Sequence, residues 1–243
     1  MRANTFVLLG LIVYPLQQQG VGIELDMPPA LRQRYSSEVE AIRVATRSTE
    51  RRMQPLFGVA PSFPLRLWSS EKSDAPVVTR VSGRPGFSID LGALGRAPER
   101  LSVLLAYEFF REIHPRFLRS EPGGGRGTEL EERLFLEGLA SYASHRAYPG
   151  LPAWRYGCHP DVPESSCQRF VAHESELAAK CLAALAEPAT SPALSDGEIR
   201  YLSYRLTKSL EGRLDPKSII LLRADEFRKD LRSRLVAKTG VAP

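Results

Sequence analysis

Two stretches of the chain hold residues whose types and spacing could do chemistry. Residues 103–114 read Val-Leu-Leu-Ala-Tyr-Glu-Phe-Phe-Arg-Glu-Ile-His, and residues 134–145 read Leu-Phe-Leu-Glu-Gly-Leu-Ala-Ser-Tyr-Ala-Ser-His. Residues four apart lie on one face of a helix, so Tyr107 and Arg111 point the same way. Alone, a Glu followed three residues later by an Arg is commonplace on helices and is usually a solvated pair. The first stretch alone therefore predicts no function, and only the second stretch downstream makes a functional prediction possible.

Together the two stretches resemble the active-site helices of the gluzincin zinc metallopeptidases. The closest likeness is to bacterial domains of unknown function that are predicted to be zinc-dependent proteases. In that family one helix carries His-Glu-x-x-His, and a downstream helix carries Glu-Gly-x-Ala-x-Tyr, whose Glu is the third metal ligand. Residues 137–142 match the second motif as Glu-Gly-Leu-Ala-Ser-Tyr, whereas residues 107–111 match the first only in part. The resemblance covers about residues 60–147 and implies a zincin-like fold, in which a small sheet precedes the first active-site helix.

The resemblance assigns a former role to four residues. Tyr107 and Arg111 stand where the two zinc histidines would be, Glu108 stands at the general-base position, and Glu137 stands at the third-ligand position. A zinc site of this kind lowers the pKa of its bound water to about 7, so that the Glu can remove a proton. A neutral phenol is a poor ligand, and a guanidinium has no lone pair to offer. We therefore expect no catalytic zinc here, and Glu108 to be vestigial.

The same resemblance makes Glu108 and Glu137 converge on one site, where repulsion and desolvation would be costly without a cation. Arg111 is the natural replacement for the metal's charge, because its planar fork matches a carboxylate. We expect an Arg111–Glu137 ion pair, with Tyr107 hydrogen-bonded nearby, to hold the two helices together. Tyr142, at the end of the second motif, is expected to support the cleft between them.

Other chemistries find less support in the chain. A metal site built from His114, His145 and a carboxylate has no characteristic spacing, and these histidines are expected at the surface or at helix ends. The sequence contains no Gly-x-Ser-x-Gly elbow of a serine hydrolase. The glycine-rich segment 123–127 lacks the Gly-Lys-Ser/Thr ending of a phosphate-binding loop, so we expect a flexible connection.

Three cysteines fit an exported protein. Cys158 and Cys167 bracket a short loop rich in Pro and Ser, where a local disulfide would hold a segment that has little core of its own. Cys181 lies in an apolar helical stretch and is expected to be a buried free thiol. A metal site made of Cys158, His159 and Cys167 lacks a fourth ligand at the usual zinc spacing.

The elements that must position these residues follow from periodicity and from start and stop signals. Apolar residues at three- and four-residue steps predict a helix from Pro28–Pro29 to about Met53. Three strands are predicted at 63–68, 76–81 and 87–91, the last two joined by a Gly-Arg-Pro-Gly hairpin at 83–86. A helix at 98–114 is expected to stop at Pro115. Capping signals start further helices at Thr128, Ser195 and Asp215. The fold class is α+β, with a small N-terminal sheet packed on a mainly helical C-terminal part.

The N-terminus predicts export. Arg2 precedes an apolar run from Thr5 to Leu16, which is shorter than the roughly 20 residues of a membrane span. We interpret residues 1–22 as a signal peptide or an N-terminal anchor and residues 23–243 as one domain. The protein would then be periplasmic, extracellular or held at a membrane through this leader. A net charge of +5 over 243 residues, without dense basic patches, speaks against nucleic-acid binding.

Three functions remain open on sequence alone. The first is an inactive zincin-like domain without a cofactor, which binds a peptide or protein in the old cleft or acts as a scaffold. The second is an active zinc peptidase with non-standard ligands. The third is a helical interaction protein unrelated to peptidases.

Overall fold

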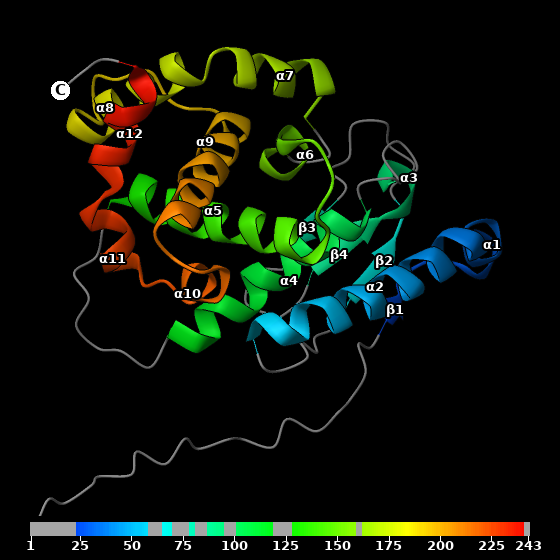
Figure 1. Ribbon diagram of the computed structural model, residues 1–243. Helices are drawn as coiled ribbons and strands as arrows, with labels where there is room; N and C mark the ends of the chain where they lie inside the picture. Colours follow the sequence, from blue (N-terminus) through cyan, green and yellow to red (C-terminus); the bar gives the residue numbers. More distant parts are fainter. Residues whose placement is uncertain are drawn as a thin grey trace, which may run out of the picture.

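A small mixed sheet lies beside a larger assembly of helices (Figure 1). The computed structural model describes residues 23–57, 65–69, 78–80, 87–94, 101–118, 128–158 and 162–240. The sheet has the order β1-β2-β4-β3. Strands β1 (Ile23–Leu25), β2 (Leu65–Trp68) and β4 (Phe87–Asp90) run parallel, and β3 (Val78–Arg80) pairs antiparallel with β4. The α+β class is thereby confirmed.

The three predicted strands are confirmed, and a fourth strand was missed. β3 and β4 pair as the hairpin prediction requires, while its turn residues 83–86 lie outside the described residues. β1 has only three residues, which is too short for an alternating pattern to stand out. In β2, the fully buried Leu65 and Leu67 alternate with the half-buried Arg66 and Trp68, so the face that carries the two leucines packs on the helices.

The helices before the candidate site differ from prediction at their ends. One helix was expected from residue 28 to about 53, but the structure has α1 (Pro29–Arg34) and then α2 (Ser36–Phe57), separated at Tyr35. Asp90, at the end of β4, accepts hydrogen bonds from the backbone N–H groups of Gly92 and Ala93 and so starts the short helix α3 (Leu91–Leu94).

The prediction that the next helix stops at Pro115 is wrong. Helix α4 runs from Leu101 to Leu118 and so continues past the proline, while residues 98–100 lie outside the described residues. Proline lacks an N–H group, so the carbonyl of Arg111 loses its usual partner four residues on, at a typical cost of about 3 kcal/mol. Contacts of α4 with α2 and with the following helix α5 (Glu129–Ala147) outweigh that local preference.

Helix α5 is the centre of the helical part. Thr128 and Glu131 form the predicted capping box at its start. Most of its residues after Arg133 are buried, and α4, α9 (Asp196–Lys208) and several shorter helices pack around it (Figure 1). A helix that is covered on nearly all sides carries no polar face, which explains why apolar and small residues follow one another through 134–144.

The remaining helices surround α5. The capping residues Ser195 and Asp215 are confirmed as N-caps of α9 and α10. In chain order the elements are α6 (Ala153–Gly157), α7 (Glu164–Ala172), α8 (Glu174–Ala186), α9 (Asp196–Lys208), the 3-10 helix η2 (Ser209–Gly212), α10 (Pro216–Ile220), α11 (Ala224–Lys229) and α12 (Leu231–Thr239).

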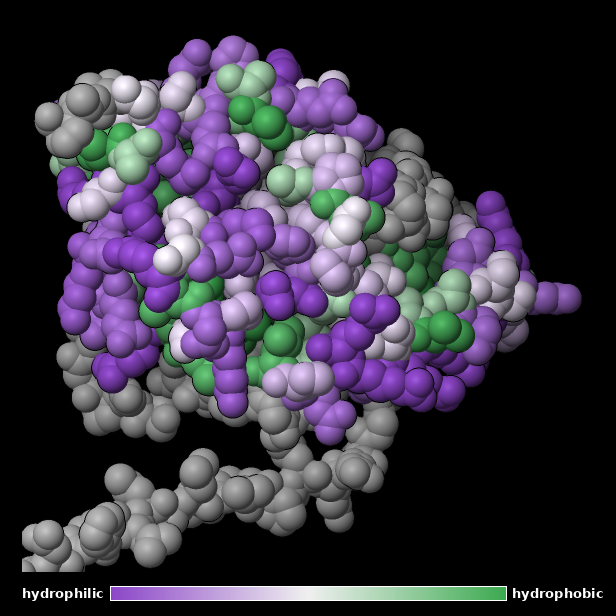
Figure 2. Space-filling model, in the orientation of Figure 1, coloured by the Kyte–Doolittle hydropathy of each residue, from purple (hydrophilic) through white to green (hydrophobic). Residues whose placement is uncertain are grey.

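Hydrophilic side chains cover most of the face shown in Figure 2, with small hydrophobic patches between them. Among the described helices, none combines the length and apolar character that crossing a membrane requires. The expected leader, residues 1–22, and the glycine-rich segment 123–127 lie outside the described residues.

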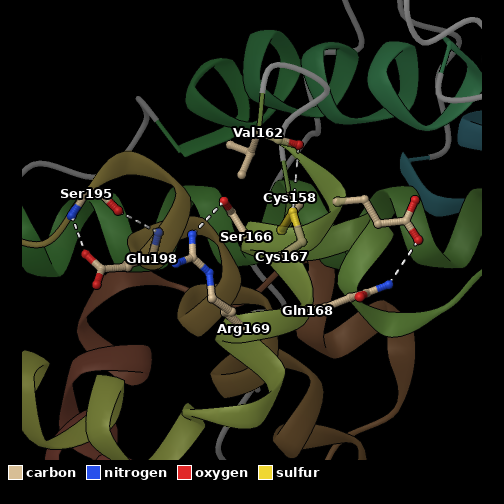
Figure 3. The surroundings of a disulfide bond; sticks show 9 residues. Cys158, Val162, Ser166, Cys167, Gln168, Arg169, Ser195 and Glu198 are labelled. Carbon is tan, nitrogen blue, oxygen red and sulfur yellow. Dashed lines mark hydrogen bonds between the residues drawn. A yellow bond between two sulfur atoms is a disulfide. The ribbon is translucent and has the colours of Figure 1, made fainter.

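The predicted disulfide is confirmed. Cys158 and Cys167 are bonded, with Cα atoms 6.1 Å apart, and they join the end of α6 to α7 (Figure 3). Cys181 is a buried free thiol, as expected, and burial raises its pKa to about 12. A raised pKa keeps this thiol protonated and unreactive at neutral pH.

Reduction of the disulfide should cost about 2 to 3 kcal/mol of unfolding free energy, the chain-entropy value for a loop of nine residues. Chemical denaturation with and without a phosphine reductant measures the loss. The Cys158→Ala/Cys167→Ala variant is the control, because its stability should not respond to the reductant. An unaltered protein whose denaturation midpoint ignores the reductant would contradict the expectation.

Candidate functional site

Three helices bring four polar side chains together. Tyr107 and Arg111 come from α4, Glu137 comes from α5, and Arg200 comes from α9. The meeting point lies where α5 contacts both α4 and α9, which are its two most extensive neighbours. We call these four residues the Glu137 cluster.

The Glu137 carboxylate is held through both of its oxygens. Its Oε1 lies 3.3 Å from Nη2 of Arg111, and its Oε2 accepts a hydrogen bond of 3.1 Å from Nε of Arg200. The hydroxyl of Tyr107 also donates to Oε2. The Arg111–Glu137 ion pair and the neighbouring Tyr107 hydrogen bond, both expected from the sequence, are confirmed.

Tyr107 is the contact point of both arginines. The guanidinium carbon of Arg200 lies 4.2 Å from the centre of the Tyr107 ring, and that of Arg111 lies 5.5 Å from it. Nη1 of Arg111 also donates to the Tyr107 hydroxyl at 3.4 Å. The ring faces attract cations, and the attraction is stronger where water is excluded. Tyr107 therefore holds both guanidinium groups beside the carboxylate as well as bonding to it directly.

Arg200 is the member that sequence reasoning missed. It lies 63 residues after Glu137 in the sequence, in a helix with charged and aromatic residues at many positions. The capping box at Ser195 correctly marks where α9 starts, but it does not tell which side of α9 faces α5. That choice depends on how closely the two helices approach each other.

Gly138 sets the distance between α5 and α9. A Cβ atom at this position would lie 2.7 Å from the backbone carbonyl oxygen of Ser203 and would also collide with the side chain of Thr207. The glycine is therefore required for close packing of the two helices rather than for an unusual backbone conformation. Because Gly138 follows Glu137 directly, the same close approach brings Arg200 to the carboxylate.

Two further residues, Glu108 and Tyr142, were assigned from the family motifs. Glu108 is buried, with 2% of its surface exposed, and it is turned about 100° around α4 from Tyr107. Tyr142 is fully buried, and burial together with the nearby Glu211 carboxylate raises its pKa. Tyr142 thus belongs to the side of α5 that faces η2 and packs away from the Glu137 cluster.

His114 does not lie at a surface, so that expectation is wrong. Its side chain is 2% exposed, and its ring stacks on Phe110 at 4.9 Å and meets the edge of Phe135 at 5.5 Å. Neither ring nitrogen has a hydrogen-bond partner among the described residues. Because α4 continues through Pro115, His114 sits inside the helix contact instead of at a frayed end. His145 is half-buried and bonds to the Tyr204 hydroxyl at 3.1 Å.

Burial of His114 predicts a loss of stability in acid. Desolvation lowers its pKa from 6.5 to about 4, so the folded protein holds the ring neutral while the unfolded chain binds a proton more readily. Stability should therefore fall as pH drops below about 6.5 and level off near 4. Between pH 7 and pH 5 the contribution is about 2 kcal/mol.

Chemical denaturation of the unaltered protein and of the His114→Phe variant at several pH values tests this predicted loss of stability in acid. The variant keeps an aromatic ring between Phe110 and Phe135, and it should lose about 2 kcal/mol less than the unaltered protein between pH 7 and pH 5. Parallel pH profiles for the two proteins would show that another group is responsible.

A small cavity adjoins the cluster. It has a volume of about 20 Å³ and is lined in part by Tyr107, Arg155 and Arg200. This is room for about one water molecule, whereas small-molecule sites typically need about 300–1,000 Å³. A peptide cannot enter at this point unless the helices separate.

The donor set of the Glu137 cluster does not fit a zinc ion. Both oxygens of Glu137 are occupied by cationic or hydroxyl donors, and neither arginine offers a lone pair. Within the described ranges, no group of three His, Cys, Asp or Glu side chains gathers as a metal site would require. In comparisons with family models, curated proteins and solved structures, nothing matched this chain.

Proposed function

We propose that this chain is a zincin-like pseudopeptidase, in which two guanidinium groups have taken the place of a catalytic metal ion. The observation that carries the proposal is the geometry at Glu137. The residue that the family motif makes the third metal ligand is bonded by Arg111, from a former histidine position, and by Arg200 from a third helix. The small sheet that precedes α4 supports the same ancestry.

Electrostatics explains why the cluster is stable without a metal. Only 11% of the Glu137 side chain is exposed, and 14% of Arg200 and 27% of Arg111. A carboxylate this well buried needs compensating charge and hydrogen bonds. The two arginines supply the charge that a dication would otherwise supply, and the Tyr107 hydroxyl supplies a further hydrogen bond.

This arrangement has no group that could activate a water molecule for hydrolysis. A zinc peptidase needs a metal-bound water of lowered pKa and a base that removes its proton. The Glu137 cluster offers permanent cations but no open coordination position. The protein is then a binding or scaffolding domain. Because the cavity beside the cluster has a volume of only about 20 Å³, we expect a protein partner to bind on the outer surface instead.

Replacing Tyr107 and Arg111 by the histidines of the zinc motif tests whether the protein descends from a zinc peptidase. The Tyr107→His/Arg111→His variant alone should bind zinc weakly, because Arg200 still holds Oε2 of Glu137. The triple variant that adds Arg200→Gln should bind zinc at least tenfold more tightly by isothermal titration.

A matched control is Tyr107→His/Arg111→His/Arg169→Gln, since Arg169 is exposed on α7 and bonds only to Ser166 among the contacts shown in Figure 3. The triple variant must be folded by circular dichroism for this comparison. If it then binds zinc no more tightly than the control, the pseudopeptidase proposal fails, and a helical interaction protein unrelated to peptidases becomes the better interpretation. Stoichiometric zinc in the unaltered chain would instead favour an active peptidase with non-standard ligands.

A further inference from the structure

The outward side of α2 carries a row of arginines. Arg43, Arg47 and Arg51 are spaced four residues apart, so they lie on one face of the helix, about 6 Å from one another along its axis. All three are exposed, and the region of α2 in Figure 2 is mostly hydrophilic. The opposite side of α2 is buried through Ile42 and Met53. We call the three arginines the arginine ridge.

The charge of the arginine ridge is not neutralised within the described part of the chain. None of its three guanidinium groups has a hydrogen bond or an ion pair with a described residue. Other exposed arginines do have carboxylate partners, as Arg133 has in Asp196 and Arg213 has in Asp230. The exposed Glu40 shares the outward face of α2, so the four groups carry a formal net charge of +2. A guanidinium is permanently charged, and its planar fork matches the oxygens of a phosphate.

Two observations favour phospholipid headgroups over an acidic protein as the partner of the arginine ridge. The first is Val44, an apolar side chain that lies among these arginines and is 60% exposed. Surfaces that bind at a membrane interface combine basic residues with apolar side chains that enter the headgroup region.

The second observation is the position of the ridge in the sequence. The apolar run that ends at Leu16 is separated from β1 by residues 17–22, which can span at most about 20 Å. Helix α2 follows soon after β1 and packs on the sheet to which β1 belongs. A leader kept as an anchor would therefore hold α2 close to the bilayer surface.

We propose that the arginine ridge binds the anionic headgroups of a phospholipid membrane, with Val44 entering the headgroup region. Each guanidinium should strengthen the binding about fivefold, and all three together about a hundredfold. Binding of this strength orients a domain that a second attachment, such as the leader, holds at the membrane. The inference rests on the outward face of α2, and it holds whether or not the chain descends from a peptidase.

Co-sedimentation of the full chain with lipid vesicles measures this binding. One set of vesicles contains phosphatidylcholine alone, and the other contains equal parts of phosphatidylcholine and phosphatidylglycerol. Binding to the uncharged vesicles reports any insertion of the apolar leader, and the difference between the two sets reports the effect of anionic headgroups. We expect about a hundredfold tighter binding to the anionic vesicles at low salt, and a smaller difference as the ionic strength rises.

The ridge variant Arg43→Gln/Arg47→Gln/Arg51→Gln should lose nearly all of this difference. Its binding to vesicles of phosphatidylcholine alone should stay unchanged, because the leader is intact. The three side chains are exposed, so the variant should fold like the unaltered protein, which circular dichroism checks.

The matched control removes the same charge from other exposed positions, on α7, α10 and α11, as Arg169→Gln/Lys217→Gln/Lys229→Gln. This control should keep the preference for anionic vesicles. Equal losses in the two triple variants would overturn the proposal, because net charge alone would then explain the binding. An unaltered chain that binds both sets of vesicles equally would also overturn it, and would leave an acidic protein as the better candidate partner.

Discussion

Replacing Glu137 by Gln is expected to destabilise the protein by about 3 kcal/mol, the low end of the cost of breaking a buried ion pair. The change leaves Arg111 and Arg200 facing each other across an amide, with 27% and 14% of their side chains exposed. The partial exposure of Arg111 is the reason for choosing the low end of that range. Urea denaturation at neutral pH measures the effect.

Asp196→Asn is the matched control for that experiment. It also removes an acidic partner of an arginine, Arg133, but the Asp196 side chain is 92% exposed. Surface pairs of this kind contribute about 0–1 kcal/mol. If Glu137→Gln costs no more than Asp196→Asn, the Glu137 cluster is a surface feature and not a buried support.

A further variant separates the effect of charge from the effect of packing on the stability of the Glu137 cluster. Replacing all three charged members together, as Glu137→Gln/Arg111→Met/Arg200→Met, should recover much of the stability that Glu137→Gln alone loses. Removing a whole buried charge group is often close to neutral, whereas removing one partner leaves an uncompensated charge. A triple variant less stable than Glu137→Gln would show that the arginine side chains matter chiefly through their packing.

Gly138→Ala is expected to cost about 2–3 kcal/mol, in the upper part of the range for overpacked cores. The new methyl group meets the Ser203 carbonyl, which is backbone and cannot rotate away, so α5 and α9 must separate. Because Arg200 comes from α9, the separation should also loosen the Glu137 cluster. Denaturation of the variant gives the stability change.

Gly212→Ala provides the comparison for Gly138→Ala. A Cβ at Gly212 would meet nothing within 4 Å, so this substitution should change stability by less than about 0.5 kcal/mol. Equal and small effects at both glycines would mean that the helices α5 and α9 are not in close contact at Gly138.

The sequence predicted those parts of the site that depend on local spacing. Tyr107 and Arg111 share a helix face because they are four residues apart, and the capping box at Thr128 fixed where α5 begins. Those two facts, together with the motif around Glu137, were enough to predict the ion pair correctly.

The parts that were missed depend on tertiary packing. Arg200 reaches Glu137 only because Gly138 lets α9 come close to α5. No local sequence pattern predicts how α9 is rotated about its own axis. His114 is buried because α4 continues through Pro115, against the local preference of proline. Strand β1 was missed because three residues do not make a pattern, and its pairing with β2 is a contact distant in sequence.

Metal content of the unaltered chain tests the central proposal most directly. The protein should be produced with added zinc, purified without chelators and analysed by mass spectrometry of its elements, alongside the triple variant Tyr107→His/Arg111→His/Arg200→Gln. We expect far less than one zinc per unaltered chain and close to one in the triple variant. One tightly held zinc per unaltered chain, lost when Glu137 is changed to Gln, would contradict the proposal that guanidinium groups have replaced the metal.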